Sequence, residues 1–350
     1  MKGIAIEGDR NVSLKDFPIP EVGLNQVLIK VKSATICGSD LHFYRASASE
    51  LGKRTSYISG HEGSGVVERV GDKVRNVGIG DRVAVFHRFG CGYCGKCRTG
   101  WPQYCESGET NSLVMGQATN PVISTGTFGE YMLAPSEVCF RIPDSINFES
   151  GSIIGCNGIT AYNIIRKLGI SSGQVVAVFG LGPLGLTAGI LLKKMGAIPI
   201  GVELSEERRK LAGKFEFFDA VSSIAELRSA VKTISDGKRE VDSALDFTGN
   251  NTAINNAVEI VKPLGSVGLV GIGPGLETAS LSPKKFLERG VTITGILVGN
   301  VLNMYELIEF VSTHKIDFSR IVTDRFRLSD PKSAFSKAEK GSFGKVALEP

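Results

Sequence analysis

The pattern of apolar and polar residues along the 350-residue chain changes near residue 150. Before that point, short runs rich in Val, Ile and Leu are separated by Gly, Pro and Asp, a pattern typical of β-strands joined by turns. After it, continuous apolar runs alternate with amphipathic segments of helical length, as in a parallel sheet covered by helices on both faces. The pattern therefore predicts an α/β protein with two domains of different architecture, the number that its length also favours.

The first region, residues 1–150, is predicted to be a mostly antiparallel, barrel-like β domain. Its clearest strands lie at residues 27–31, 65–70, 82–86 and 130–134. Each is short and bounded by turn-forming residues, which is typical of strands joined by tight connections.

The second region, residues 151–297, contains enough candidate strands for a doubly wound dinucleotide-binding sheet. They lie at residues 175–179, 198–202, 220–221, 243–246, 266–270 and 291–294, with a helix over 186–195. The tail offers a helix and two strands, at 304–312, 321–326 and 345–348. We expect residues 298–350 to return to the first domain.

Composition narrows the class of partner. Apolar residues make up 42% of the chain and charged residues 22%, and the net charge of +4 is the difference between 40 basic and 36 acidic residues. With no long block of one sign, no nucleic-acid partner is predicted. The strongest apolar stretch, 184–192, is much shorter than the roughly 20 residues of a membrane span. The N-terminus has no apolar signal sequence, so we expect a cytoplasmic protein without membrane contact.

Four cysteines lie within fifteen residues: Cys91, Cys94, Cys97 and Cys105. Four thiolates complete one tetrahedral zinc site, and the glycines and proline between them allow the tight turns that such a site needs. Two disulfides or four unconnected thiols are the alternatives, and they fit poorly with a chain that has no secretion signal. We therefore predict a structural zinc lobe over residues 88–108, with no ligand position left for a substrate.

A glycine-rich turn follows the strand predicted at residues 175–179. Its residues Gly180, Gly182, Pro183, Leu184 and Gly185 match the pattern of a phosphate-binding turn that opens a helix, although a plain turn in an α/β domain is an alternative. Glu203 ends the next strand, where a carboxylate binds the adenosine ribose and favours NAD over NADP. Arg208 or Arg209 could instead accept a 2′-phosphate. Thr248 and Val270 follow later strands at the edge where such sheets bind ligands.

Cys37, His61 and Cys156 form a second candidate metal site. Two thiolates and one imidazole hold zinc while leaving a fourth position open, which is the pattern of a catalytic zinc. Each residue alone has a simpler interpretation, a buried cysteine or a histidine at a turn. Their separation along the chain does not by itself bring them together.

Together these motifs resemble those of the zinc-dependent alcohol dehydrogenases in the medium-chain dehydrogenase/reductase (MDR) superfamily. The resemblance covers essentially the whole chain and rests on Gly60-His61-Glu62 with Gly65, Gly71 and Val74, the four-cysteine lobe, Cys156 with Thr160, and the turn at Gly180. It implies a GroES-like catalytic domain, a Rossmann domain that binds NAD, and two zinc ions per chain, one catalytic and one structural.

The resemblance also implies a role for each residue of the site. Cys37, His61 and Cys156 would hold the catalytic zinc, with Glu62 as an alternate ligand, and Asp40 would orient the His61 ring. Ser39 would contact the substrate oxygen and His42 would end the proton relay, while the zinc polarises an alcohol that passes hydride to the nicotinamide. Lys345 would supply a charge for the cofactor pyrophosphate, because Gly38 stands where some relatives have a basic residue.

The substrate stays open between simple alcohols and polyols or sugars. Residues 37–44 resemble polyol dehydrogenases, but Cys156 stands where these enzymes usually have glutamate. A zinc-free quinone reductase would lack both cysteine sets, and a non-catalytic, redox-sensing nucleotide-binding protein is the alternative of another class. The resemblance implies a homo-oligomer, with a tetramer favoured over a dimer.

Three residues outside these motifs also need an interpretation. His87 and Arg88 precede the cysteine lobe, and we expect them in a solvated loop, with selection of a polar substrate as the alternative. Cys139, the remaining cysteine, is flanked by Val138 and Phe140. We expect it to lie in the core.

Overall fold

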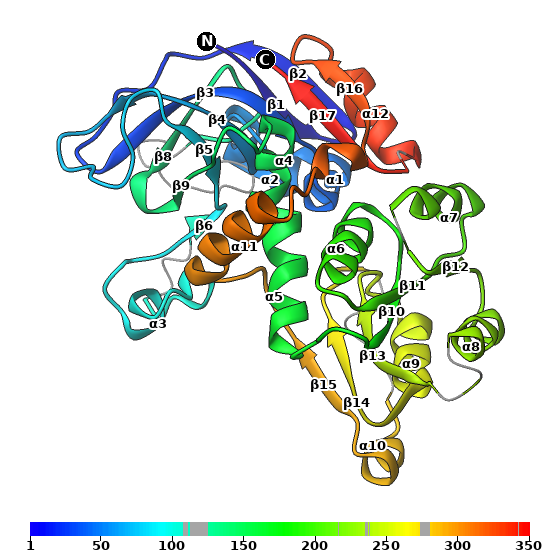
Figure 1. The fold of residues 1–350 in the computed structure, drawn as a ribbon. Coiled ribbons are helices and arrows are strands. Elements are labelled where there is room, and N and C mark those ends of the chain that lie inside the picture. The colour runs from blue at the N-terminus through cyan, green and yellow to red at the C-terminus, as the bar shows by residue number, and fades with distance from the viewer. Residues whose placement is uncertain are drawn as a thin grey trace. The chain divides into compact units, whose positions relative to one another are not determined.

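The computed structural model describes residues 1–107, 111–112, 125–215, 217–234, 237, 239–273, 281–341 and 343–350. The backbone forms two compact units, which Figure 1 shows with their elements labelled. The first unit contains Met1–Cys156 and Asn300–Pro350, and the second contains Asn157–Gly299.

The first unit is built on a seven-stranded sheet of order β16-β17-β3-β4-β5-β9, with β8 also paired to β3. Two smaller sheets pair β1 with β2 and β6 with β7. The strands of the unit are β1 (Lys2–Gly8), β2 (Asn11–Asp16), β3 (Gln26–Thr35), β4 (Glu62–Val70), β5 (Arg82–Val85), β6 (Arg88–Phe89), β7 (Asn111–Ser112), β8 (Tyr131–Pro135), β9 (Cys139–Arg141), β16 (Val322–Arg327) and β17 (Lys345–Glu349). The C-terminal β17 pairs antiparallel with β3, so the end of the chain completes a sheet that its beginning starts. Strand pairing within this sheet is antiparallel except between β16 and β17.

Short helices connect and cover these strands. They are α1 (Gly38–Arg45), α2 (Ala48–Leu51), α3 (Gly95–Arg98), α4 (Phe148–Ile153), α11 (Val301–Thr313) and α12 (Pro331–Gly341), with 3₁₀ turns η1 (Gly52–Ser56), η2 (Pro102–Tyr104), η4 (Ser136–Val138) and η8 (Phe318–Ile321). Ile29, Phe86 and Met132 are completely buried between the layers.

The second unit is a six-stranded parallel sheet of order β12-β11-β10-β13-β14-β15. The strands are β10 (Val175–Phe179), β11 (Ile198–Val202), β12 (Asp219–Val221), β13 (Val241–Asp246), β14 (Val261–Leu269) and β15 (Thr292–Gly295). The helices are α5 (Ile159–Lys167), α6 (Pro183–Lys194), α7 (Glu206–Ala212), α8 (Ile224–Thr233), α9 (Asn251–Ile260) and α10 (Pro283–Arg289), with the 3₁₀ turn η6 (Gly213–Phe215).

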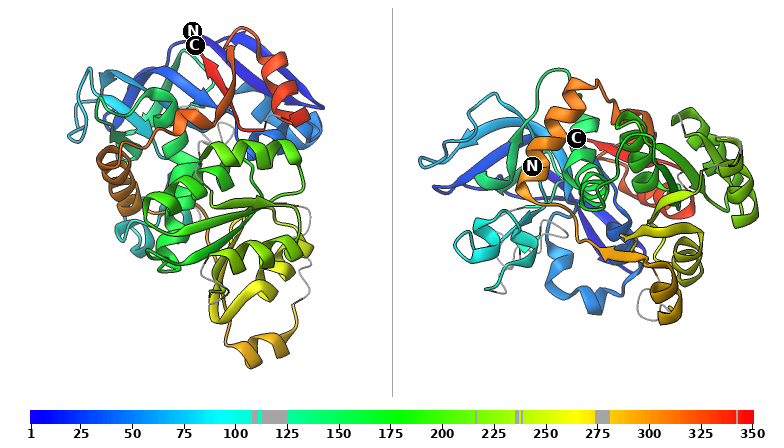
Figure 2. Two further views of the ribbon diagram at one scale, coloured as in Figure 1. Left: turned by 45° about the vertical axis from the view of Figure 1, so that its right-hand side comes forward. Right: turned by 60° about the horizontal axis from the view of Figure 1, so that its bottom comes forward.

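Helices cover both faces of this parallel sheet. Helices α5 and α6 pack together on one face, and α8 and α9 pack together on the other (Figure 2). Strand β10 is buried along its whole length, which explains its continuous apolar sequence. The order of the strands reverses between β10 and β13, the point at which sheets of this kind bind ligands.

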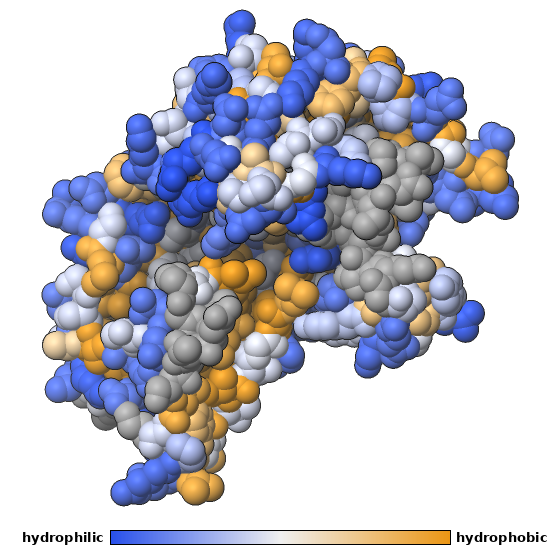
Figure 3. Space-filling view, turned by 180° about the vertical axis from the view of Figure 1, so that it is seen from behind, coloured by the Kyte–Doolittle hydropathy of each residue, from blue (hydrophilic) through white to orange (hydrophobic). Residues whose placement is uncertain are grey.

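Strand β15 forms one edge of the parallel sheet. Two leucines in this unit, Leu264 and Leu287, are 84% and 86% exposed. Figure 3 shows apolar side chains at the lower end of the molecule, the end that α10 occupies.

The strands expected from the sequence are all present, with ends that differ by a few residues. Helix α6 begins at Pro183, three positions before the start expected at Leu186, because proline is favoured in the first turn of a helix, where its missing N–H removes no bond. Cys139 is buried, as expected. No helix within the described ranges is long and apolar enough to cross a membrane.

Candidate active site

Three local structures present the thiols and the imidazole of the second candidate metal site. Cys37 is the N-cap of α1, and its backbone N–H donates to Oδ2 of Asp40 at 2.8 Å. His61 immediately precedes β4. Cys156 lies in a turn of π-helix, Ile154–Gly158, which follows α4. Irregular turns of this type are frequent at functional sites.

The structure brings Cys37, His61, Glu62 and Cys156 together, with their ligand atoms all within 4.8 Å of one another. Cys156 Sγ lies 3.7 Å from His61 Nε2. Sulfur and nitrogen ligands on one tetrahedral zinc lie about 3.6 Å apart, given the usual bond lengths. Of the four, only Cys37 is partly exposed. The donor set and its spacing therefore fit zinc.

Asp40 fixes the orientation of the His61 ring. The carboxylate is completely buried, and its Oδ1 accepts a hydrogen bond from His61 Nδ1 at 3.2 Å. Burial lowers the pKa of His61, but the charges of Asp40 and Cys37 outweigh it and raise the pKa well above 6.5. With Nδ1 bound to Asp40, the ring directs Nε2 toward the Cys156 sulfur, as a metal-binding imidazole requires.

The two cysteine thiols interact with each other. A hydrogen bond from Cys156 lowers the pKa of the Cys37 thiol well below its ordinary value, although burial opposes this shift. The same bond, together with burial, raises the pKa of Cys156 well above it. One of the two sulfurs is therefore held as a thiolate, the form that binds metal.

Glu62 and Lys345 form a buried ion pair beside these ligands. Lys345 Nζ donates to Glu62 Oε2 at 2.5 Å and to the carbonyl of Ile36 at 3.1 Å. The Thr35 hydroxyl also donates to Glu62 Oε2, while Glu62 Oε1 is buried without a hydrogen-bond partner. Burial raises the pKa of Glu62 to about 7, although Lys345 opposes this shift. Sequence reasoning missed both this pair and Thr35, because nothing in the sequence links positions 283 residues apart.

Ser39 and His42 both lie on α1. Ser39 Oγ is 3.5 Å from His61 Nε2, so this hydroxyl borders the ligand cluster. His42 is exposed one turn further along the helix. Residues three apart share one face of a helix. The helix therefore leads from the cluster to solvent.

His87 and Arg88 do not lie in a solvated loop, and that expectation was wrong. His87 is 2% exposed, its Nδ1 donates to the carbonyl of Gly155 at 3.0 Å, and its ring centroid lies 5.0 Å from that of His61. Arg88 begins β6 and is partly buried. The cause is the pairing of β6 with β7, which turns this segment inward instead of leaving it in water.

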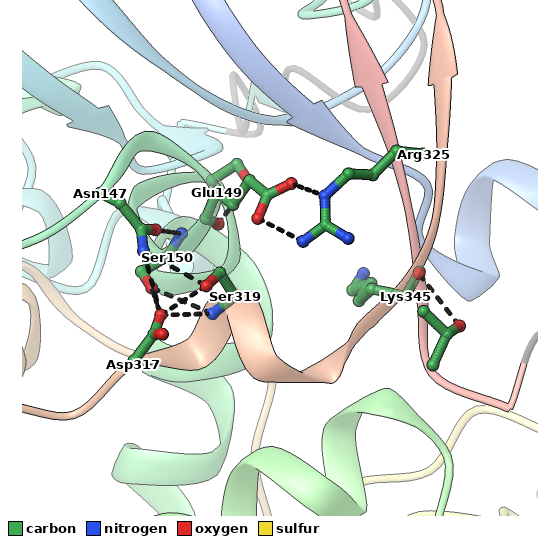
Figure 4. Close-up of polar contacts among 9 residues, drawn as sticks. Asn147, Glu149, Ser150, Asp317, Ser319, Arg325 and Lys345 are labelled. Carbon is green, nitrogen blue, oxygen red and sulfur yellow. Dashed lines mark hydrogen bonds and ion pairs between the residues drawn. The ribbon is translucent and has the colours of Figure 1, made fainter.

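A polar network anchors α4, the helix that precedes the Cys156 turn. Asn147 caps α4 and donates to Asp317 Oδ1 at 3.0 Å, and Ser150 and Ser319 donate to the same oxygen. Figure 4 shows these four residues grouped together. The network ties α4 to the tail at η8 and so supports the segment that carries Cys156.

An ion pair joins α4 to the tail strand β16. Two of the guanidinium nitrogens of Arg325, Nε and Nη2, donate to the Glu149 carboxylate at 2.6 and 2.8 Å. Figure 4 shows the two side chains facing each other. Two parallel bonds of this kind fix geometry better than a single contact does.

The four cysteines of the lobe also converge. Cys91, Cys94, Cys97 and Cys105 place their sulfurs within 4.8 Å of one another, and Cys91 Sγ lies 3.9 Å from Cys97 Sγ. Sulfurs on one tetrahedral zinc lie about 3.8 Å apart. All four are free thiols, so the structure contains no disulfide here.

The cysteine lobe favours thiolates at most of its positions. Backbone N–H groups donate to the sulfurs of Cys91, Cys94 and Cys105 at 3.4 to 3.5 Å. Hydrogen bonds outweigh burial and lower the pKa of these three thiols, whereas burial raises the pKa of Cys97 to about 12. Three of the four thiols thus have a lowered pKa, and Cys97 lies among them. This arrangement fits a structural zinc bound by four sulfurs.

In the second unit, the glycine-rich turn has the shape of a phosphate cradle. Gly180 has φ +89°, and a Cβ on Gly185 would lie 1.9 Å from the carbonyl oxygen of Gly180. A Cβ on Gly182, the N-cap of α6, would meet nothing within 4 Å. Pro183 and Leu184 form the first turn of α6 and are partly exposed. The glycines at 180 and 185 therefore serve the fold, and the one at 182 leaves room for a ligand.

Glu203 closes this turn. Its two carboxylate oxygens accept hydrogen bonds from the backbone N–H groups of Leu181 and Ser205, both at 3.0 Å. Arg208 lies 3.6 Å from the same carboxylate, while Arg209 donates to the carbonyls of Glu203 and Leu204. Both arginines already have partners. The negative charge of the Glu203 carboxylate therefore dominates the position beside the glycine-rich turn.

Thr248 and Val270 follow the carboxyl ends of β13 and β14. The buried Asp246 accepts hydrogen bonds from the Thr248 N–H and hydroxyl, at 3.1 and 2.6 Å. Burial raises the pKa of Asp246, although these bonds oppose it. The Val270 N–H donates to the Asp246 carbonyl at 3.0 Å. Both residues therefore lie at the binding edge of the sheet beside the glycine-rich turn.

Two family models match the chain, one within the first unit and one that covers most of the second unit and continues into α11. The model for the alcohol dehydrogenase GroES-like domain matches residues 23–144, and the model for the zinc-binding dehydrogenase matches residues 183–313. An uncharacterized zinc-type alcohol dehydrogenase-like protein of Escherichia coli K12, YphC, is 32% identical over 98% of this chain and 97% of its own length. The chain belongs to the zinc-type alcohol dehydrogenases.

Other relatives and solved structures agree. An L-threonine 3-dehydrogenase of Escherichia coli is 29% identical over 99% of both chains. The structure of 2R,3R-butanediol dehydrogenase from Bacillus subtilis has a TM-score of 0.84 and 25% identity, over 100% and 99% of the two chains. An alcohol dehydrogenase of Escherichia coli CFT073, solved with NADH, has a TM-score of 0.86 and 26% identity over the same shares.

These relatives establish the class of this alcohol dehydrogenase. It is a zinc-dependent oxidoreductase that converts alcohols or polyols with a nicotinamide cofactor, on a GroES-like domain and a Rossmann domain. A redox-sensing protein without catalysis and a zinc-free reductase are both excluded as its class.

Proposed function

We propose that this alcohol dehydrogenase holds two zinc ions per chain and reversibly oxidises a primary or secondary alcohol with NAD. The observation that carries the proposal is the convergence of Cys37, His61 and Cys156 in one buried cluster that offers three ligands and an adjoining carboxylate. Three protein ligands leave a position for a substrate oxygen, whereas the four sulfurs of the cysteine lobe leave none. The lobe zinc therefore serves the fold.

The residues around the cluster have distinct tasks. Zinc, when bound, acts as a Lewis acid on the substrate oxygen. Asp40 holds the His61 ring, and Glu62, with Oε1 free, is placed to act as an alternate ligand. The Ser39 hydroxyl receives the substrate proton, and the exposed His42 passes it to solvent.

The cofactor binds along the cradle of the second unit. The N–H groups at the start of α6 receive the pyrophosphate, with Gly180, Gly182, Pro183, Leu184 and Gly185 shaping the turn. Thr248 and Val270 line the neighbouring strand ends. Lys345 was expected to meet the pyrophosphate; its observed ion pair with Glu62 supports a role within the first unit instead, so we assign it there.

NAD is favoured over NADP because Glu203 occupies the position beside the adenosine ribose and would repel a 2′-phosphate. Replacing Glu203 with Gln removes this charge and keeps one of the two oxygens that accept backbone N–H groups. We expect E203Q to raise the ratio of kcat/KM for NADP to that for NAD by about tenfold or more. In the E203Q background, Arg208→Gln should lower NADP use again. An unchanged ratio in E203Q would contradict the assignment.

The decisive test of the zinc assignment is Cys156→Ser, with zinc content measured by mass spectrometry. We expect about one zinc per chain instead of about two, an intact fold by circular dichroism, and loss of alcohol oxidation. A C156S variant that oxidises alcohols at the parent rate would overturn the assignment. A panel of primary, secondary, cyclic and polyol substrates then decides between an alcohol and a polyol or sugar dehydrogenase.

We further infer a cytoplasmic homo-oligomer, with a tetramer favoured over a dimer. The place of β15 at the edge of the sheet and the exposed Leu264 and Leu287 support association through the second unit. Light scattering of the parent and of a Leu264→Lys, Leu287→Lys variant tests this. A monomeric parent would refute it.

A further inference from the structure

The side chain of Arg88 is a partly buried cation that has no partner among the described residues. Its Nε is buried and forms no hydrogen bond, and among the described residues no carboxylate lies within ion-pair distance of its guanidinium. Burying a charge without a partner is costly, so such groups are usually paired with an acid or bound to a ligand.

Arg88 also lies beside the ligand cluster. Its neighbour His87 packs against the His61 ring and binds the carbonyl of Gly155, the residue before Cys156. Burial lowers the pKa of Arg88, and the charge of the nearby Cys156 opposes this shift. Arginine keeps its charge even when buried, and its planar fork matches carboxylate and phosphate oxygens.

We propose that Arg88 binds an anionic group of the substrate, so that the preferred alcohol carries a carboxylate or a phosphate near its hydroxyl group. This inference rests on the proposed function, because it places the hydroxyl of the same substrate at the Cys37, His61 and Cys156 cluster. The anion would then form the ion pair that Arg88 does not make with any described residue. The buried His87 side chain beside it adds a polar wall.

One competing explanation is that Arg88 offsets the negative charge of the ligand cluster. Lys345, which is paired with Glu62, already places a positive charge beside the ligand cluster. A charge-offsetting role would change the reaction of every substrate alike. Recognition of an anion would instead change the ratio between charged and neutral substrates, and that ratio is what an experiment should measure.

The test compares matched pairs of substrates on the zinc-loaded enzyme with NAD: 3-hydroxybutanoate against 3-hydroxybutanamide, and glycerol 3-phosphate against glycerol. We expect the parent to prefer the anionic member of at least one pair, and the pair that shows it distinguishes carboxylate from phosphate. Arg88→Gln should lower that preference about 10- to 100-fold, the usual effect of losing a charge-assisted hydrogen bond. Arg88→Lys should restore part of it. Arg98→Gln, which removes an exposed charge from the same lobe, should leave it unchanged.

Calorimetry supplies a readout that does not depend on turnover. Butanoate or inorganic phosphate should bind the zinc-loaded parent more tightly than butanamide, and R88Q should abolish the difference. The inference is overturned if neither anion binds, if the parent prefers the neutral alcohols, or if R88Q affects both members of a pair equally. In each case an enzyme that still contains zinc and oxidises alcohols leaves the proposed function standing.

Discussion

Lys345 and Glu62 form an ion pair of 2.5 Å in which both side chains are buried, at 1% and 0% exposed. The pair joins the last strand of the chain to the strand that follows the ligand His61. Its position beside the ligand cluster makes the C-terminal tail part of the site, although the tail is 283 residues away from Glu62 in sequence.

Replacing Lys345 with Met leaves Glu62 buried without its cation. Loss of one partner from a buried ion pair costs about 3–5 kcal/mol. We expect K345M to be destabilised by this amount in urea unfolding of the zinc-loaded protein. The double variant E62Q, K345M should recover most of the loss, because neither charge remains. A K345M variant as stable as the parent would show that the pair contributes little.

Replacing Cys97 with Ser removes one ligand of the cysteine lobe. We expect the zinc content to fall by about one ion per chain, and hydrogen exchange in residues 91–105 to rise, because metal binding and folding of such lobes are coupled. Cys139→Ala is the matched control: this buried thiol lies outside both clusters, so zinc content should be unchanged. Retention of both ions by C97S would contradict the four-sulfur site.

The glycines of the cradle predict two different phenotypes. Gly182→Ala places its methyl group in open space, so we expect at most about 1 kcal/mol of lost stability but about tenfold weaker NADH binding. Gly185→Ala drives a methyl group into the Gly180 carbonyl and should cost about 1–3 kcal/mol. Thermal unfolding and NADH fluorescence titrations measure the two effects. Equal NADH affinity in G182A and the parent would exclude close approach of the cofactor there.

The Asp317 network predicts a dependence on pH. Burial raises the pKa of Asp317, but hydrogen bonds from Ser319, Asn147 and Ser150 outweigh it and lower the pKa below its usual 3.8. A lowered carboxylate pKa stabilises the folded state above pH 3.8, and this stabilisation is lost as the pH falls through the folded value.

Asp317→Asn lacks this contribution. We therefore expect the stability difference between the parent and D317N to be constant above about pH 5 and to shrink below pH 4. Urea unfolding at a series of pH values measures it. A difference that grows on acidification would show that the network does not depend on the carboxylate.

Much of the fold follows from local pattern. The strand Val175–Phe179 was predicted with the bounds that the structure shows, because a short continuous apolar run is typical of a strand that is buried on both faces of a parallel sheet. The four cysteines of the lobe were likewise recognisable, since all of their spacing is local. The interpretation of His87 and Arg88 failed because their burial depends on the pairing of β6 with β7, which leaves no signature in two residues.

The sequence by itself determined the helices and strands, the two sets of candidate zinc ligands and the family. Motifs such as the glycine-rich turn extend over only a few residues, so they can be recognised without the fold. Only the tertiary structure decided that Cys37, His61 and Cys156 meet, that Lys345 pairs with Glu62, and that Arg88 is partly buried with no partner among the described residues. Those contacts join residues from distant parts of the chain. Their energies depend on burial and distance, and neither quantity exists until the sheets have formed.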